Sequence, residues 1–305
     1  MTNIARPTKP LADVNVLPQS DCSHKITVVF MPNMASLYGE GSIKAFLAID
    51  GSVSMKTMYG DGSIFMNLPN YVEAVTRKIG EILTEVTGSR TISAIYWSVG
   101  PDGGEVEDIG EFDGAGWKKA SIKGPRVEQW GRGSKLLPAI QYIVKNFTKD
   151  ADWTIGAILT DGIIEDEEEC FTFCQEVGRK YEGMRPEPVK LVFIGIGENV
   201  DEGQLERFDN MFEGTGIDYD LFSFGVVSLI KEESDILSLF FSDLVSDDVF
   251  VAPMGRVEDS KGNVLISWSD GMPGKFEFIL PKGEKQFAIK APGVDIVQDV
   301  SEAIS

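Results

Sequence analysis

The chain has 305 residues, an ordinary apolar fraction of 43% and a formal net charge of −20. So acidic a chain lacks the basic face that binding to nucleic acid or to an anionic membrane requires, which argues against both as partners. No run of about 18 apolar residues is present to span a membrane, and no secretory signal is visible at the start of the sequence. The length predicts two domains, or one large domain with an appendage.

The three cysteines, Cys22, Cys170 and Cys174, are too few for a disulfide framework. Cys170 and Cys174 are spaced i, i+4 with no second Cys or His pair nearby, which favours two small residues on a helix face over a zinc site. The single histidine, His24, is expected at a loop or a strand edge. Together these features predict a cytoplasmic protein.

The first part of the chain predicts a leader and then two strands. Residues 1–20 are expected to be disordered, and residues 25–31, within an N-terminal segment 21–42, have the β-branched content of a strand. Residues 43–49 form an apolar run that ends at once in polar, Gly-rich sequence. Such a run is typical of a strand buried on both faces of a parallel sheet.

Strands and helices then alternate along the chain. Further strands are expected at residues 91–99, 104–112, 155–160, 189–196 and 218–224, and helices at 71–86, 135–147, 167–181, 201–212 and 235–245. This alternation predicts a doubly wound, mostly parallel, Rossmann-like α/β sheet over residues 43–248.

The pattern changes after Asp248. Short strands are expected at residues 250–252, 264–269, 275–280 and 286–291, separated by Gly and Pro turns. Residues 249–305 therefore predict a small all-β module at the C-terminus. The strand at 25–31 can join this module, because the two ends of a chain often lie close together.

Polar side chains follow the buried strands of the predicted sheet. Asp50, Ser52 and Ser54 follow the first strand, Asp161 follows another, and Ser134 lies in a Gly-containing loop that opens a helix. Ligands of doubly wound sheets bind at this edge, so these residues should converge. Two carboxylates and three hydroxyls form an all-oxygen site suited to Mg²⁺, or to Mn²⁺ or Ca²⁺. Because so few carboxylates leave the ion under-neutralised, we expect an Asp or Glu of a partner protein to complete it.

The pattern Asp50-x-Ser52-x-Ser54, with a later loop hydroxyl and an Asp-Gly pair after a strand, resembles the metal-ion-dependent adhesion site (MIDAS) of von Willebrand factor A-type (vWA) domains. The resemblance covers about residues 44–245. It implies direct metal contacts from Ser52, Ser54 and Ser134, with Asp50 and Asp161 acting partly through water. Ser134 departs from the family's threonine but keeps the hydroxyl. The resemblance implies binding and no catalysis, and bacterial vWA proteins that work with ATPase or stress-response (tellurite-resistance-like) systems are similar in their acidic character.

Other interpretations stay open at this point. A haloacid dehalogenase-like phosphohydrolase also has an Asp after its first strand, but it needs a second Asp as general acid where this chain has Ser52. A metal-free scaffold could bind through the β module instead. Asp50 could simply form an Asx-turn, and residues 165–169 either form the first turn of a helix or add a second cation site. Residues of the rim loops either form a binding surface or pack the loops down: Met55, Met58, Tyr59 and Trp130.

Overall fold

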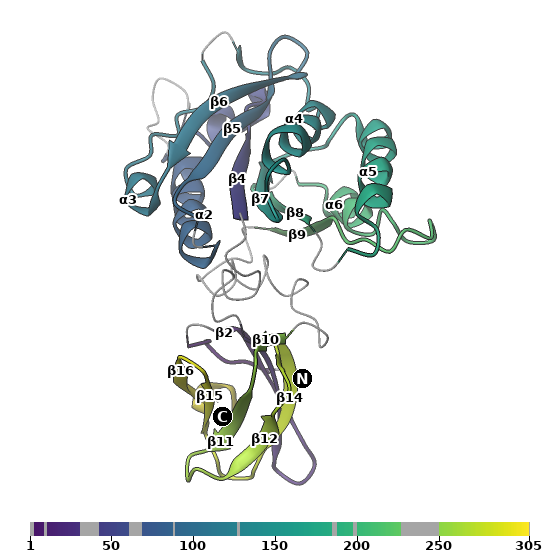
Figure 1. The fold of residues 1–305 in the computed structure, drawn as a ribbon. Helices are drawn as coiled ribbons and strands as arrows, with labels where there is room; N and C mark the ends of the chain where they lie inside the picture. The colour runs from purple at the N-terminus through teal and green to yellow at the C-terminus, as the bar shows by residue number, and fades with distance from the viewer. Residues whose placement is uncertain are drawn as a thin grey trace. The chain divides into compact units, whose positions relative to one another are not determined.

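The computed structural model describes residues 3–8, 11–30, 43–60, 69–87, 89–126, 129–184, 188–197, 200–226 and 250–304 (Figure 1). The chain divides into two compact units. Glu40–Lys231 forms an α/β unit, and Met1–Gly39 together with Glu232–Ser305 forms a β module. Each unit is described by itself.

The α/β unit is built on a six-stranded sheet with the order β6-β5-β4-β7-β8-β9. All neighbouring pairs are parallel except β5 and β6, so β6 is an antiparallel edge strand. The chain moves outward from β4 in one direction and then restarts at β7 on the other side, which makes the sheet doubly wound. This confirms the predicted fold class. The strands are β4 Ile43–Asp50, β5 Ile92–Val99, β6 Glu105–Phe112, β7 Trp153–Thr160, β8 Val189–Gly195 and β9 Phe222–Val226.

Helices cover both faces of this sheet (Figure 1). Helix α2 packs on β4 and β5, and the short α3 packs on α2. Helices α4, α5 and α6 bury their apolar residues in one core with the other face of the strands. Because both faces are covered, every residue of β7 is buried, as the continuous apolar run predicts. The helices are α2 Tyr71–Thr87, α3 Gly114–Trp117, α4 Leu137–Phe147, α5 Glu167–Tyr181 and α6 Glu202–Asp209.

The β module consists of two four-stranded antiparallel sheets and one two-stranded pair, β10-β13. The orders of the larger sheets are β1-β2-β3-β14 and β12-β11-β15-β16. Aromatic rings join the two sheets, with centroids 4.8 Å apart for Trp268 and Phe276 and 4.9 Å apart for Phe278 and Phe287. The elements are β1 Asn3–Ile4, β2 Leu11–Pro18, β3 His24–Phe30, β10 Phe250–Ala252, β11 Gly255–Asp259, β12 Val264–Trp268, β13 Met272–Pro273, β14 Lys275–Leu280, β15 Gln286–Ala291, β16 Val294–Asp299 and the short helix α8 Ser301–Ile304.

The N-terminal strand does join the C-terminal module, because β3 pairs antiparallel with β14. The pairing places Ile26 opposite Phe278 and Val28 opposite Phe276, and all four side chains are buried. Alternate residues of each strand therefore supply one apolar face to the core.

The structure differs from the sequence-based prediction in the segment 1–20, which was expected to be a disordered leader. Strand β2 lies within this segment and pairs with β3, with Leu11, Val14 and Val16 buried. Prolines and polar residues within this segment obscure the alternating pattern of β2, and the stability of β2 comes from a strand next to it in the sheet. This burial of alternate residues is the physical reason for the difference.

Other differences concern the ends and number of elements. Strands β11 and β16 were not predicted, α6 ends three residues early at Asp209, and β9 begins at Phe222 instead of residue 218. The expected helix at 235–245 lies outside the described residues. Among the helices in the described ranges, none combines the length and apolar character needed to cross a membrane.

Candidate functional site

The candidate site lies where β4 and β7 end side by side in the sheet. Asp50 is the last residue of β4, and Thr160 is the last residue of β7, followed at once by Asp161. Strands β4 and β7 are parallel neighbours at the point where the strand order reverses. This is the position at which doubly wound sheets bind their ligands.

Asp50 is buried and held by hydrogen bonds at both carboxylate oxygens. Its side chain is fully buried, Oδ1 accepts from the backbone N–H of Ser52 at 2.8 Å, and Oδ2 accepts from Thr160 Oγ1 at 3.0 Å. Tyr59 donates its hydroxyl to the backbone carbonyl of Asp50 at 2.9 Å. The Asx-turn considered from the sequence is therefore present, and it leads into the rest of the site.

A chain of oxygen atoms runs from this turn to the next strand. Ser52 Oγ and Ser54 Oγ share a hydrogen bond of 2.8 Å, and Ser54 Oγ donates to Asp161 Oδ1 at 3.0 Å. The structure thus brings four of the five predicted residues together. Asp50, Ser52 and Asp161 are buried, and Ser54 is exposed to solvent.

Burial disfavours the charged form of both carboxylates of the site. Burial raises the pKa of Asp50 to about 7, and the nearby charge of Asp161 adds to this. Burial also raises the pKa of Asp161 above its ordinary value. No basic side chain is among the causes that act on either group. A cation bound between them would favour both charged forms, and hard oxygen donors of this kind suit Mg²⁺, Mn²⁺ or Ca²⁺.

The loop that carries Ser134 is attached to the first loop by its backbone. Gly131 accepts from the N–H of Val53 at 2.8 Å and donates its own N–H to Gly51 at 3.1 Å, so it lies beside Ser52. The carbonyl of Ser134 accepts from the N–H of Glu165 at 2.9 Å. The loop is therefore in place, although Ser134 Oγ makes no hydrogen bond to the other four residues among those described.

Two contributors to the site were missed at the level of sequence. Thr160 was noted only as part of the strand end, yet it donates to Asp50. A hydroxyl residue that closes an otherwise apolar run is the signal that could have identified it. Ser98, at the end of β5, donates to the carbonyl of Gly133 at 2.5 Å, and no sequence pattern marks it.

The donor set differs from a metal cluster made of acidic side chains alone. Within the described part of the chain, no three His, Cys, Asp or Glu residues are grouped to hold an ion. The rim instead offers two carboxylates with serine hydroxyls, as the sequence predicts. The residues present fit a hard divalent cation that takes additional ligands from water or from a partner.

The rim loops contain both packing residues and exposed apolar residues. Met55 and Tyr59 are buried, and the ring of Tyr59 meets that of Trp130 edge-on at 5.3 Å, so these residues pack the loops down. Val53 and Ile163, each within two residues of a candidate ligand, are 46% and 60% exposed. Two exposed apolar side chains therefore lie close to the polar centre in sequence.

The acidic run at residues 165–169 has structural partners. Asp166 accepts from the N–H groups of Leu136 and Leu137 at 2.7 and 2.9 Å, which satisfies donors at the start of α4. Glu167 forms an ion pair with Arg207 at 2.6 Å. These contacts favour the helix-turn interpretation of this run over a second cation site.

Cys170, Cys174 and His24 are buried in packed parts of the fold. Cys170 and Cys174 are free and lie on the buried face of α5, within the core, and burial raises the pKa of both thiols. This agrees with the prediction of small residues on a helix face. His24 is the first residue of β3 and is buried, which places it at a strand end as expected.

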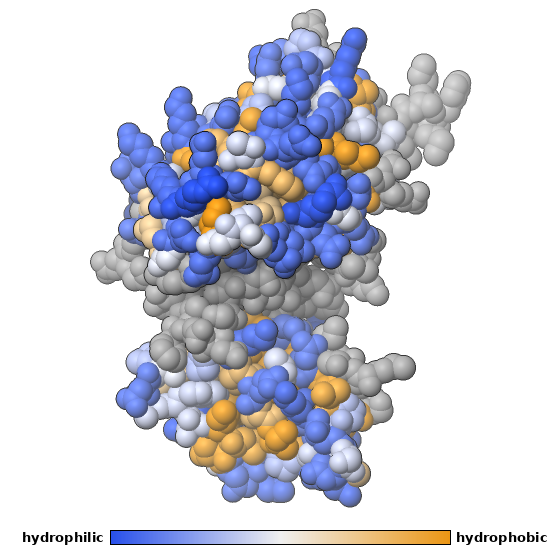
Figure 2. Space-filling model, turned by 90° about the vertical axis from the view of Figure 1, so that its right-hand side faces the viewer, coloured by the Kyte–Doolittle hydropathy of each residue, from blue (hydrophilic) through white to orange (hydrophobic). Residues whose placement is uncertain are grey.

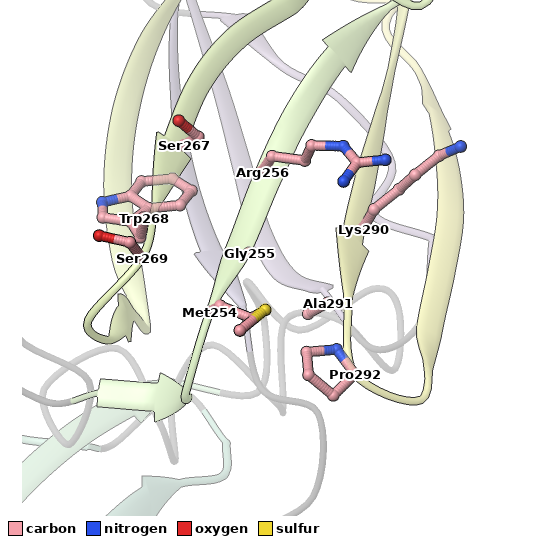
Figure 3. Close-up of a pocket in the computed structure, with 9 residues that line it drawn as sticks. All are labelled: Met254, Gly255, Arg256, Ser267, Trp268, Ser269, Lys290, Ala291 and Pro292. Carbon is pink, nitrogen blue, oxygen red and sulfur yellow. The ribbon is translucent and has the colours of Figure 1, made fainter.

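A hollow of about 430 Å³ lies in the β module (Figure 3). Its lining includes Arg256, Lys290 and Trp268. Both cations face one carboxylate, because Glu258 lies 2.6 Å from Arg256 and 3.3 Å from Lys290. Figure 2 shows apolar residues gathered on a face of this module. Met254, which lines the hollow, is exposed. The cations of the hollow are already paired, so the rim of the α/β unit is the stronger candidate site.

The fold and the rim define the larger unit as a doubly wound α/β domain with a hydroxyl–carboxylate site at the topological switch. The strand and helix order, with one antiparallel edge strand, is the order that the resemblance to vWA domains requires. No family model matches the chain, and no curated protein matches it.

Solved structures do match the chain. A von Willebrand factor type A protein from Catenulispora acidiphila is 12% identical, with a TM-score of 0.41 over 90% of this chain and 67% of that chain. The PilB minor pilin from Streptococcus sanguinis is 10% identical, with a TM-score of 0.43 over 80% and 77%. Proximal thread matrix protein 1 from the mussel byssus, with a zinc-occupied MIDAS motif, is 14% identical, with a TM-score of 0.42 over 70% and 48%. The fold class rests on the strand order of the sheet itself.

Proposed function

We propose that this chain is a metal-dependent protein-binding module. In this proposal a divalent cation, Mg²⁺ or alternatively Mn²⁺ or Ca²⁺, binds at the rim and takes the carboxylate of a partner's Asp or Glu as a further ligand. The ligands are Ser52, Ser54 and Ser134, with Asp50 and Asp161 acting partly through water. The bound ion supplies a positive charge that holds the partner's carboxylate.

The continuous chain from Ser52 through Ser54 to Asp161 is the observation that carries the proposal. Its oxygens lie 2.8 and 3.0 Å apart, and they come from two loops separated by more than a hundred residues. An Asx-turn alone does not require these hydroxyls to meet a second carboxylate. Burial raises the pKa of Asp161, and a cation bound beside this carboxylate would favour its charged form.

The surroundings of Asp50 support binding over phosphoryl transfer. A nucleophilic aspartate needs an accessible oxygen, whereas Asp50 is fully buried and both of its oxygens accept hydrogen bonds. Ser52 stands where a haloacid dehalogenase-like enzyme needs its acid. The phosphohydrolase hypothesis would be revived by turnover of a generic phosphate ester that disappears in Asp50→Asn.

A metal-free scaffold that binds through the β module is the remaining alternative. The apolar face and the hollow of that module give it a specific surface (Figures 2 and 3). We keep the metal-dependent module as the leading proposal, with a cytoplasmic location. An ATPase or a stress-response component is the partner class that the resemblance to bacterial vWA proteins implies.

Affinity capture from a cell extract tests the proposed function. Wild type and Ser54→Ala are used as baits in Mg²⁺ and in EDTA, and Glu168→Gln serves as an acidic control in the same unit. We expect wild type and Glu168→Gln to retain one or more of the same proteins in Mg²⁺ and to lose them in EDTA. Ser54→Ala should fail to retain these proteins. Capture that persists in EDTA, and that requires the β module, would favour the scaffold.

A further inference from the structure

Ser98 has an unusual conformation for a buried residue. It is fully buried near the end of β5, and its φ angle of 56° lies in the left-handed region that residues other than glycine rarely adopt. Such a conformation costs free energy and persists only where the surroundings hold it. Here the side chain uses it to donate a hydrogen bond of 2.5 Å from Oγ to the carbonyl of Gly133.

The loop at residues 129–134 sits directly on the backbone near Ser98. A Cβ atom on Gly131 would lie 2.0 Å from the carbonyl oxygen of Ser98, and one on Gly103 would lie 1.9 Å from that of Gly133. Neither position can carry a side chain without moving the backbone. The loop is therefore packed closely against this backbone, and the Ser98 hydroxyl adds a side-chain hydrogen bond to it.

Gly133 directly precedes Ser134, the candidate ligand whose side chain makes no hydrogen bond to the rest of the site. On the other side, the hydrogen bond that holds Ser134 within the described residues runs from the N–H of Glu165 to the Ser134 carbonyl. The position of the Ser134 hydroxyl therefore depends on how Gly133 is anchored. Ser98 supplies that anchor from a different strand.

We propose that Ser98 is a positioning residue that holds the Ser134 hydroxyl in place for the metal. The inference rests on the proposed metal site and extends it to a residue that does not touch the ion. Loss of the Ser98 hydroxyl leaves the Gly133 carbonyl without its donor, and the loop can then shift Ser134 away from the ion. Such supporting groups commonly change metal affinity by roughly 10- to 100-fold.

The test measures Mn²⁺ affinity from the electron paramagnetic resonance signal of the free ion. We expect affinity to fall about tenfold in Ser98→Ala and in Ser98→Gly. Glycine accepts the positive φ, so Ser98→Gly keeps the fold even where alanine is strained. The double variant with Ser134→Ala should bind no more weakly than Ser134→Ala alone, because both changes remove the same ligand.

A spectroscopic readout separates positioning from a general loss of stability. The number of water molecules on bound Mn²⁺, counted by pulsed measurements in D₂O, should rise in Ser98→Gly and in Ser134→Ala. Ser223→Ala is the matched control, because Ser223 is a buried serine of the same sheet whose Oγ has no partner among the described residues. It should match wild type in both affinity and water count.

Two results overturn the inference while leaving the metal site intact. One is an equal Mn²⁺ affinity of wild type, Ser98→Gly and Ser98→Ala. The other is a double variant in which the two losses of affinity simply add. A wild type that does not bind Mn²⁺ would instead defeat the proposed function itself, and the inference with it.

Discussion

Thr160 Oγ1 donates a hydrogen bond of 3.0 Å to Asp50 Oδ2 and so joins the ends of two neighbouring parallel strands. Both side chains are fully buried. The bond satisfies Oδ2 of Asp50, while the Ser52 N–H satisfies Oδ1. The orientation of the Asp50 carboxylate is therefore fixed before any ligand arrives.

Removing the Thr160 hydroxyl should destabilise the α/β unit. In Thr160→Val the Asp50 oxygen loses its buried donor, and we expect the free energy of unfolding to fall by about 1–3 kcal/mol in urea titrations. Thr160→Ser keeps the hydroxyl and should recover most of this loss. Equal losses of unfolding free energy in the two variants would show that packing of the Thr160 methyl group matters as much as its hydroxyl. That result would contradict a stabilising role for the hydrogen bond.

The site predicts a specific pH dependence of stability. The pKa of Asp50 is raised from 3.8 to about 7 in the folded protein, so folding favours its protonated form. The contribution of this group to the free energy of unfolding should therefore fall as pH rises from about 4 to about 7 and then level off. Unfolding measured across this range in EDTA should show the decline in wild type and a weaker one in Asp50→Asn.

Metal affinity should change with pH in the opposite direction. Because a metal binds the carboxylate form, binding below pH 7 releases a proton, and affinity should rise by up to about tenfold per pH unit between pH 5 and 7. Mn²⁺ titrations at several pH values measure this slope. An affinity that is flat across the range would contradict a role for Asp50 in metal binding.

Two glycines of the rim should respond differently to alanine. A Cβ on Gly131 would collide with the Ser98 carbonyl, so Gly131→Ala should move the loop and weaken Mn²⁺ binding at least tenfold. Gly162 follows Asp161 directly, yet a Cβ there meets nothing within 4 Å. Gly162→Ala should bind Mn²⁺ like wild type. A comparable loss of Mn²⁺ affinity in both variants would contradict the importance of the close packing at Gly131.

The pairing of the two chain ends can be tested by paired isoleucine variants. Ile26 on β3 is fully buried, so Ile26→Ala should lower the stability of the β module by about 2–5 kcal/mol. Ile279 on the partner strand β14 is 51% exposed, and Ile279→Ala should change stability by no more than about 0.5 kcal/mol. Calorimetric unfolding measures both, and similar effects would contradict the observed register.

Much of the α/β unit could be predicted because its strands are buried on both faces. Continuous apolar runs at β4, β7 and β8 leave little ambiguity, and the alternation with helices fixes the class of sheet. The β module was harder to predict, because β2, β11 and β16 are half-exposed and pair with other strands of the sheets. Pairing between segments about 250 residues apart, as between β3 and β14, leaves no local pattern in either strand.

The residues of the candidate site also fall into those that the sequence predicts and those that it does not. Asp50, Ser52, Ser54 and Asp161 follow buried strands, so topology alone predicts that they converge. Ser98 could not be found from the sequence, because its role depends on a left-handed backbone and on a carbonyl 35 residues away. The rim packing of Tyr59 likewise depends on three-dimensional contact with Trp130.

Calorimetric titration with Mg²⁺ and Mn²⁺ tests the central claim most directly. Wild type, Asp50→Ala, Ser54→Ala and the control Glu168→Gln are titrated at pH 7.5 or above, where Asp50 is largely ionised. The account predicts saturable binding to wild type and Glu168→Gln and its loss or strong weakening in Asp50→Ala and Ser54→Ala. Equal heats for all four proteins, or no binding to wild type by either metal, would contradict a metal site at this rim.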